Sequence, residues 1–180
     1  MKPLDHFLQR WRLNKARSYV NGKSVLDIGS YDGALYRLLP DIMYYFGVDP
    51  AVASEKREPN YNLARGFFPA QVPDNLRFDV ITLFAVLEHI LVAEQRPLAR
   101  NCYAYLNSGG YVLITVPSPV VDLILYFLKF LRLIDGMSIE EHYGFDMRQT
   151  PDIFQSAGFR LVKHETFQLG LNNLFVFVKP

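Results

Sequence analysis

The sequence lacks the features that mark secreted proteins. It contains a single cysteine, Cys102, so no disulfide can form within the chain. No apolar stretch of the kind that a secretory signal requires follows the first residues. These absences exclude a disulfide-stabilised scaffold and lead us to expect a cytoplasmic protein.

A strong net charge is also missing. Nineteen lysines and arginines face 18 aspartates and glutamates, a formal net charge of +1, so no global field attracts nucleic acid. Basic residues are nevertheless concentrated at one end, where residues 1–23 contain Lys2, Arg10, Arg12, Lys15, Arg17 and Lys23 against Asp5 alone. We expect no nucleic-acid partner, and the basic segment alone does not reverse that expectation.

The apolar content is sufficient for one core. The chain has 180 residues, of which 50% are hydrophobic, and no linker or repeat divides it, so residues 1–180 are expected to form a single domain. Short apolar runs alternate with helix-period segments, which predicts βαβ units and a parallel sheet. The last two runs flank a turn around Gly170 and predict a hairpin that adds an antiparallel pair. The predicted strands lie at 24–28, 44–48, 78–84, 111–116, 159–167 and 173–179.

A glycine-containing turn follows the first predicted strand, in the stretch VLDIGSYDGAL (25–35). Ligands of open α/β sheets bind at such strand ends. Gly29 and Gly33 are four residues apart, which departs from the Gly-x-Gly-x-x-Gly of dinucleotide folds. Asp27 would repel a pyrophosphate and suits an amine, whereas Asp49, at the end of the next strand, suits a ribose. S-adenosylmethionine satisfies both carboxylates, and NAD is a poorer match.

Four motifs in register resemble those of class I S-adenosylmethionine-dependent methyltransferases, especially small bacterial enzymes similar to quinone-biosynthesis methyltransferases. They are VLDIGSYDG, GVDP, FDVITLFAVLEHI (78–90) and LNSGGYVLITVPS (106–118), followed by HYGFDMRQTPDIFQSAGF (142–159). The resemblance covers nearly the whole chain. It implies a Rossmann-like α/β fold, with a mostly parallel seven-stranded sheet, one antiparallel strand and helices on both faces.

The resemblance also implies a set of cofactor-binding residues. Asp27, Gly29 and Gly33 would cradle the methionine end, and Asp49 would bind the ribose. The main chain around Gly66 and Phe67 would meet the adenine, and the segment from Phe84 to Leu87 would line the sulfonium side. The implied residues are Asp27, Gly29, Ser30, Gly33, Asp49, Pro50, Gly66, Phe67, Phe84 and Leu87. Two residues depart from the family pattern: Tyr31 replaces a small residue in the turn, and Phe67 replaces an acid that binds the adenine amine.

Two histidines are candidate general bases, because imidazole titrates near neutral pH. His89 follows the fourth predicted strand in LEHI, and His142 lies in the loop EEHYGF. The alternatives are a role for His89 in the architecture of the pocket and an ordinary solvated loop around His142. No metal site is expected.

Two helical segments bear on the acceptor. The insert at 119–138 is apolar over most of its circumference but has no run long enough to span a membrane. A lid over a hydrophobic acceptor, a homodimer interface, a peripheral membrane contact and a helix buried against an extended core all fit it. The N-terminal helix, at about 4–20, places Leu4, Phe7, Leu8 and Trp11 on one face, as in a helix that packs on its own domain or lies on a surface.

The sequence therefore predicts methyl transfer from S-adenosylmethionine to a small or lipid-like acceptor, most simply at oxygen, with S-adenosylhomocysteine as product. A carbon or nitrogen methyltransferase with the same cofactor site is the alternative among enzymes. A binding or scaffold protein without turnover is the alternative outside them, favoured by Tyr31 and Phe67. A nicotinamide-dependent oxidoreductase is disfavoured by the glycine spacing. Base methylation is disfavoured because an Asn/Asp-Pro-Pro-Tyr/Phe element is missing.

Overall fold

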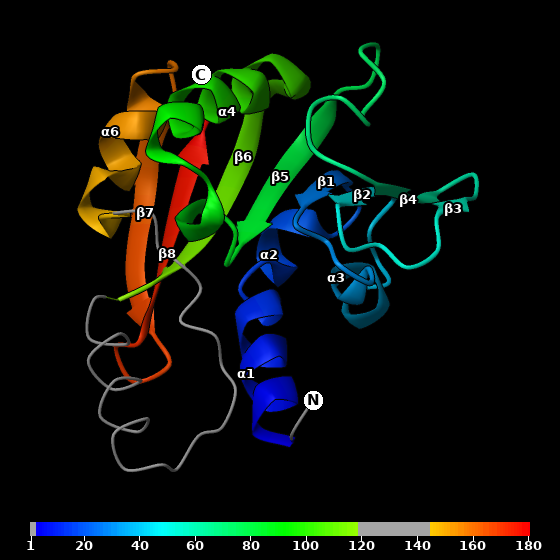
Figure 1. Ribbon diagram of the computed structural model, residues 1–180, viewed down its shortest axis with the longest axis horizontal. Coiled ribbons are helices and arrows are strands. Elements are labelled where there is room, and N and C mark those ends of the chain that lie inside the picture. The colour runs from blue at the N-terminus through cyan, green and yellow to red at the C-terminus, as the bar shows by residue number, and fades with distance from the viewer. Residues whose placement is uncertain (1–2, 119–144) are drawn as a thin grey trace.

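The computed structural model describes residues 3–118 and 145–180. Its centre is one sheet of eight strands in the order β3-β4-β2-β1-β5-β6-β8-β7 (Figure 1). The strands are β1 (Ser24–Ile28), β2 (Tyr44–Asp49), β3 (Lys56–Arg57), β4 (Tyr61–Arg65), β5 (Phe78–Phe84), β6 (Leu106–Pro117), β7 (Arg160–Phe167) and β8 (Asn172–Val178).

The strand directions confirm the predicted α/β class and mostly parallel sheet. β4, β2, β1, β5 and β6 run parallel to one another, while β8 is antiparallel to both β6 and β7. The predicted hairpin is therefore present, and β8 is the expected reversed strand. The structure adds one strand to the expected seven, because the two exposed residues of β3 pair antiparallel with β4. So short and polar a segment carries no apolar alternation by which it could be recognised.

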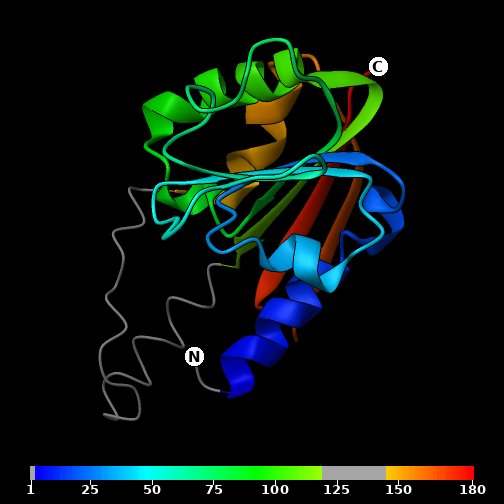
Figure 2. The same cartoon turned by 90° about the vertical axis from the view of Figure 1, so that its right-hand side faces the viewer.

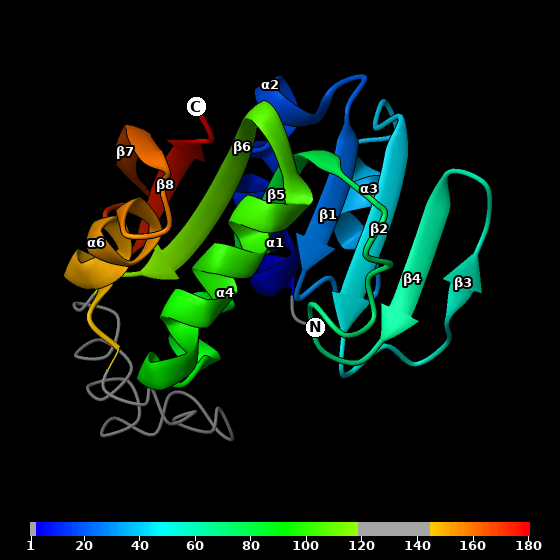
Figure 3. The same ribbon diagram turned by 90° about the horizontal axis from the view of Figure 1, so that it is seen from above.

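Helices cover both faces of the sheet, as expected (Figure 3). The α-helices are α1 (Pro3–Asn14), α2 (Arg17–Val20), α3 (Ala34–Leu38), α4 (Val92–Tyr105) and α6 (Thr150–Gln155), and the short 3-10 helices are η1 (Leu87–His89) and η2 (Met147–Gln149).

Each face of the sheet has its own apolar core, because alternate residues of a strand point to opposite sides. In β1, Leu26 joins the core shared with α4 and α6, whereas Val25 joins the core shared with α1, α2 and α3. β2 repeats this alternation with Phe46 and Tyr45.

The N-terminal segment forms two helices where a single one was expected, since α1 ends at Asn14 and α2 starts at Arg17. Lys15, the residue after α1, forms an ion pair with Glu165 of β7, an edge strand of the sheet. The predicted insert at 119–138 lies outside the described residues. Within the part that the structure describes, no helix has the length and apolarity needed to cross a bilayer.

Candidate functional site

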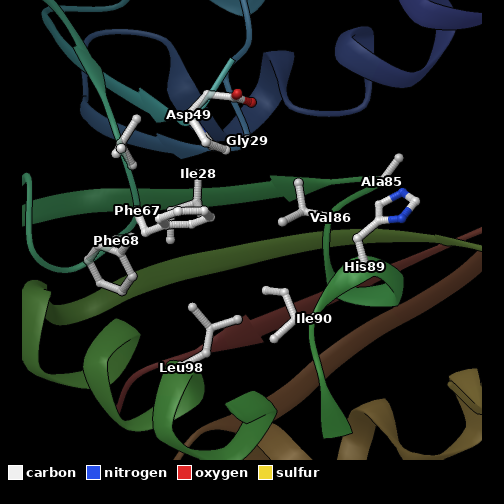
Figure 4. Close-up of a pocket in the computed structure, with 13 residues that line it drawn as sticks. Ile28, Gly29, Asp49, Phe67, Phe68, Ala85, Val86, His89, Ile90 and Leu98 are labelled. Carbon is white, nitrogen blue, oxygen red and sulfur yellow. The ribbon is translucent and has the colours of Figure 1, made fainter. Parts of the chain in front are cut away.

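A cavity of about 700 Å³ lies at the carboxyl ends of β1, β2, β4 and β5 (Figure 4). This is the edge where open α/β sheets bind ligands. Its described walls are Ile28, Gly29, Val48, Asp49, Pro50, Gly66, Phe67, Phe68, Ala85, Val86, His89, Ile90 and Leu98. The walls are mainly apolar, and the charged group among them is the carboxylate of Asp49.

The turn after β1 approaches the cavity at Gly29, which has a φ of +79°. A Cβ at this position would lie 2.2 Å from Cγ2 of Val86, a distance that real Cβ atoms do not show. The backbone N–H of Gly29 donates to the carbonyl of Val48 at 2.9 Å, which ties the turn to β2. Only glycine satisfies both the left-handed backbone and this close packing.

The carboxylate of Asp49 is held in one orientation by two backbone donors. Its Oδ2 accepts from the N–H of Tyr31 at 3.0 Å, and its Oδ1 accepts from the N–H of Ala51 at 2.7 Å. Tyr31 donates from a left-handed conformation, with a φ of +48°, which is rare outside glycine. Each carboxylate oxygen can accept a further hydrogen bond. Asp49 thus presents a fixed acceptor to a ligand in the cavity.

Asp27 lies beneath the turn and does not line the cavity. The hydroxyls of Tyr45 and Thr82 both donate to its buried carboxylate, at 2.7 Å each. Burial raises the pKa of Asp27 to about 6, against the lowering effect of these two hydrogen bonds. The described contacts therefore give this carboxylate a place in a polar network inside the sheet.

The other turn residues expected at the site, Ser30 and Gly33, also stand apart from the cavity. Gly33 has a φ of +73°, and a Cβ there would lie 2.3 Å from the Tyr61 hydroxyl oxygen. Its N–H donates to the carbonyl of Ser30 at 2.9 Å, just before α3 begins. These two residues shape the turn and the packing of α3.

The loop after β4 brings Gly66 and Phe67 to the cavity, as expected, together with Phe68. The N–H of Gly66 donates to the carbonyl of Asp49 at 3.2 Å, so this loop is joined to the end of β2. Phe67 is 71% exposed, so its ring is accessible to a ligand. Figure 4 shows both phenylalanines at one end of the cavity.

Only the middle of the expected segment from Phe84 to Leu87 reaches the cavity, at Ala85 and Val86. Phe84 packs against the core beneath α1 to α3, and Leu87 is fully buried in the opposite core. Ala85 has a φ of +58°, which turns the chain sharply after β5 and sends its two flanks in different directions. A sequence motif does not reveal that reversal.

His89 lines the cavity at the end opposite Phe67 and Phe68 (Figure 4). It ends η1, directly after Glu88, which is buried beside Arg12 of α1. Burial lowers the pKa of Arg12, whereas the charge of Glu88 raises it. His142, the other predicted base, lies outside the described residues.

Sequence reasoning missed several apolar walls of the cavity, namely Ile28, Val48, Phe68, Ile90 and Leu98. Ile28 directly precedes Gly29, and Val48 directly precedes Asp49. The only sequence signal for these two walls was therefore their position at the end of a predicted strand. The remaining three come from a loop, the end of η1 and α4, which the fold alone brings together.

Comparisons with known proteins agree with this architecture. A family model described as a methyltransferase domain matches residues 4–164. A ubiquinone biosynthesis O-methyltransferase of Coxiella burnetii is 31% identical over 121 residues, which cover 61% of this chain and 50% of that protein. The chain thus spans about half the length of the curated relatives that it matches.

Solved structures share the fold at low identity. An N-methyltransferase from Bradyrhizobium japonicum has a TM-score of 0.68 and 16% identity, covering 99% of this chain and 98% of that one. Magnesium protoporphyrin IX methyltransferase from Synechocystis, with bound SAH, has a TM-score of 0.65 and 15% identity, covering 96% and 84% of the two chains. The match over residues 4–164 decides the family, since it includes every described wall of the cavity. The chain belongs to the methyltransferase-domain family, and the class expected from its motifs, that of the class I S-adenosylmethionine-dependent methyltransferases, is confirmed.

Proposed function

We propose that this chain transfers the methyl group of S-adenosylmethionine to an oxygen atom of a small or lipid-like acceptor. The observation that carries the proposal is the fixed carboxylate of Asp49, which shares one cavity with the turn at Gly29 and the accessible ring of Phe67. The cavity volume of about 700 Å³ lies within the range of small-molecule sites.

The described residues fit an adenosyl cofactor. Asp49 would accept hydrogen bonds from the ribose hydroxyls, and Phe67 offers a ring on which the adenine can stack. Gly29, which has no side chain, would let the methionine end approach the backbone of the turn. When bound, S-adenosylmethionine supplies a methyl group on a cationic sulfur, positioned for in-line displacement by the acceptor. Asp27, Ser30 and Gly33 would then act from behind the turn by fixing its shape.

His89 is the described residue best placed to act on the acceptor, because it lines the end of the cavity opposite Phe67. We assign to it the removal of the proton from an acceptor hydroxyl. The apolar side chains of Val86 and Ile90 line the cavity between His89 and the two phenylalanines in Figure 4 and favour a lipophilic acceptor. Attack through oxygen is supported by the name of the Coxiella burnetii relative, a ubiquinone biosynthesis O-methyltransferase.

Calorimetric titration with S-adenosylmethionine, S-adenosylhomocysteine and NAD tests the cofactor assignment. We expect both adenosyl compounds to bind and NAD to give no heat. Asp49→Ala should weaken S-adenosylhomocysteine binding by about tenfold to a hundredfold, since charge-assisted hydrogen bonds to the ribose are lost. The matched control is Asp152→Ala, which removes an exposed carboxylate on α6 and should leave the affinity unchanged. Equal affinities for wild type and Asp49→Ala would refute the assignment.

A second function, ligand binding or scaffolding without turnover, is favoured by Tyr31, whose bulky side chain stands in the turn with a φ of +48°. Incubation with methyl-labelled S-adenosylmethionine and a panel of phenolic, amine and prenylated acceptors separates the two functions. Label in a product, and its position on oxygen, nitrogen or carbon, identifies a methyltransferase and the attacked atom. Cofactor binding with no labelled product across the panel would support the scaffold.

A further inference from the structure

An exposed apolar surface lies at the carboxyl edge of the sheet, outside the cavity. We call it the apolar edge surface; it consists of Phe7 and Trp11 on α1 and Leu169 in the turn between β7 and β8. These side chains are 59%, 36% and 95% exposed, respectively. None of the three lines the cavity that holds Asp49 and His89. The methyl-transfer site therefore leaves this surface without an explanation.

The turn that carries Leu169 is strained and firmly held. Gln168 and Leu169 have φ values of +53° and +59°, in the left-handed region that bulky residues rarely adopt. Such strain persists only where the surroundings enforce it. Here the Gln168 side-chain amide donates to the Leu8 carbonyl of α1 at 2.7 Å, and the Ser118 hydroxyl donates to the Gly170 carbonyl at 2.6 Å. α1 and the residue that follows β6 thus hold the turn in a conformation that exposes the Leu169 side chain to water.

α1 contributes an aromatic and basic stripe to the same surface. The rings of Phe7 and Trp11 meet edge to face, with their centroids 5.8 Å apart. Arg10 and Asn14 share that helix face by their spacing and line one shallow hollow with the two rings. Leu13, which lies off this stripe, is buried in the core. Exposed aromatic rings suit the interface of a bilayer, and the long stem of a neighbouring arginine can lie along apolar surface while its charge stays in water.

The two parts of the apolar edge surface are positioned to meet one flat partner. Figures 1 and 2 both show α1 and the β7–β8 turn at the same end of the molecule. The hydrogen bond from Gln168 to Leu8 joins them directly. Glu165, an acid on β7 near this end, is already paired with Lys15 and Lys163, so it does not oppose an anionic partner.

We propose that the apolar edge surface docks the chain on a bilayer that contains anionic lipids. Phe7, Trp11 and Leu169 would enter the interfacial region, while Arg10 pairs with lipid phosphates. Arg10 is an exposed base in the hollow beside the two rings, and no acid is among the described residues that line this hollow, which favours anionic lipid over a second copy of the chain. The proposal does not depend on the identity of the acceptor. It would place the carboxyl edge, and with it the mouth of the methyl-transfer site, toward the membrane.

Trp11 provides the readout, because it is the single tryptophan of the chain. The purified protein is mixed with vesicles of phosphatidylcholine alone and of phosphatidylcholine with phosphatidylglycerol. With the anionic vesicles we expect Trp11 emission to shift to the blue and to be quenched by brominated acyl chains. High salt should weaken this binding, since the lipid charges are screened. Flotation with unchanged Trp11 emission, or an equal response to neutral vesicles, would overturn the proposal.

Leu169→Asn is the most informative variant. Asparagine adopts the left-handed conformation more readily than leucine, so the turn should remain intact. Loss of one apolar anchor should lower vesicle affinity by about tenfold. The matched control is Met43→Asn, which replaces a side chain that is 57% exposed just before β2, at the opposite edge of the sheet. Equal losses in the two variants would show that general hydrophobicity, and not this surface, drives binding.

The cationic part has its own pair of variants. Arg10→Gln should reduce binding to anionic vesicles, and Lys56→Gln, which removes an exposed charge from β3, should not. S-adenosylhomocysteine affinity, measured by calorimetry, should be equal in all four variants if the surface and the cofactor site are separate. A dimer in sedimentation velocity that Leu169→Asn abolishes would overturn the proposal in favour of a second copy of the chain.

Discussion

Gly29→Ala is expected to lower the free energy of unfolding by about 2–5 kcal/mol, through two separable effects. The first is backbone strain, since a φ of +79° costs a residue with a Cβ about 1–2 kcal/mol. The second is steric, because the new Cβ would lie 2.2 Å from Cγ2 of Val86. Forcing a carbon into a packed contact of this kind typically costs about 1–3 kcal/mol.

Gly109→Ala isolates the backbone effect. Gly109 has a φ of +76°, close to that of Gly29, and a Cβ there would have no neighbour within 4 Å. Gly109→Ala should therefore lower the free energy of unfolding only by the cost of backbone strain, about 1–2 kcal/mol. The difference between the two variants measures the contact with Val86.

Val86→Ala supplies the complementary test. In the double variant Gly29→Ala/Val86→Ala the contact is gone, so the two changes should be non-additive by about 1–3 kcal/mol. Urea denaturation of the wild type, both single variants, the double variant and Gly109→Ala gives every quantity needed. If Gly29→Ala and Gly109→Ala prove equally stable, or if Val86→Ala gives no rescue, the steric reasoning is refuted.

Three further predictions concern other groups at or near the cavity. Burial raises the pKa of Asp27 from 3.8 to about 6, so the folded chain binds this proton more tightly than the unfolded chain, and ionisation of Asp27 reduces stability as pH rises through that window. The free energy of unfolding of Asp27→Asn relative to wild type should therefore rise by about 3 kcal/mol between pH 3 and pH 8. If urea denaturation gives the same difference between the two proteins at every pH, this reasoning is contradicted. Phe67→Ala should weaken S-adenosylhomocysteine binding by about tenfold while Phe67→Trp retains it, because a stacked ring is worth on the order of 1 kcal/mol or more; calorimetry showing equal affinities would exclude adenine stacking. His89→Ala should lower kcat and leave cofactor affinity intact, whereas matching losses in both would indicate a structural role.

Apolar patterning predicted most of the sheet, and the exceptions have a physical cause. The runs at β1, β2, β5, β6 and β8 are strongly apolar because both faces of the sheet are covered there. β4 was missed as a run because, near the edge, only Leu63 of its five residues is buried. β6 starts at Leu106, before Gly109 and Gly110, which read as a turn; the structure accommodates them in a register shift opposite β5.

The sequence predicted those residues of the candidate site that lie at the end of a strand or helix, where position alone brings them to the cavity. Gly29, Asp49, Pro50, Gly66, Phe67 and His89 lie at strand or helix ends that face the cavity. Asp27 is the instructive exception: it occupies a motif position, but strand geometry points its carboxylate toward Tyr45 and Thr82. Whether a side chain faces the ligand or the sheet interior depends on one residue of strand register, which no spacing in the sequence specifies.

The position of β8 imposes an order on how the molecule can be assembled during synthesis. β8 follows β7 in the chain, yet it pairs on one side with β6 and on the other with β7. β6 must therefore keep an open edge until residues 172–178 leave the ribosome, and β7 cannot join the sheet before them. All described walls of the cavity come from residues 28–98, so they emerge earlier. The ligand-binding half of the sheet can take shape first, while the exposed edge of β6 is the point at which a stalled chain is most prone to aggregate.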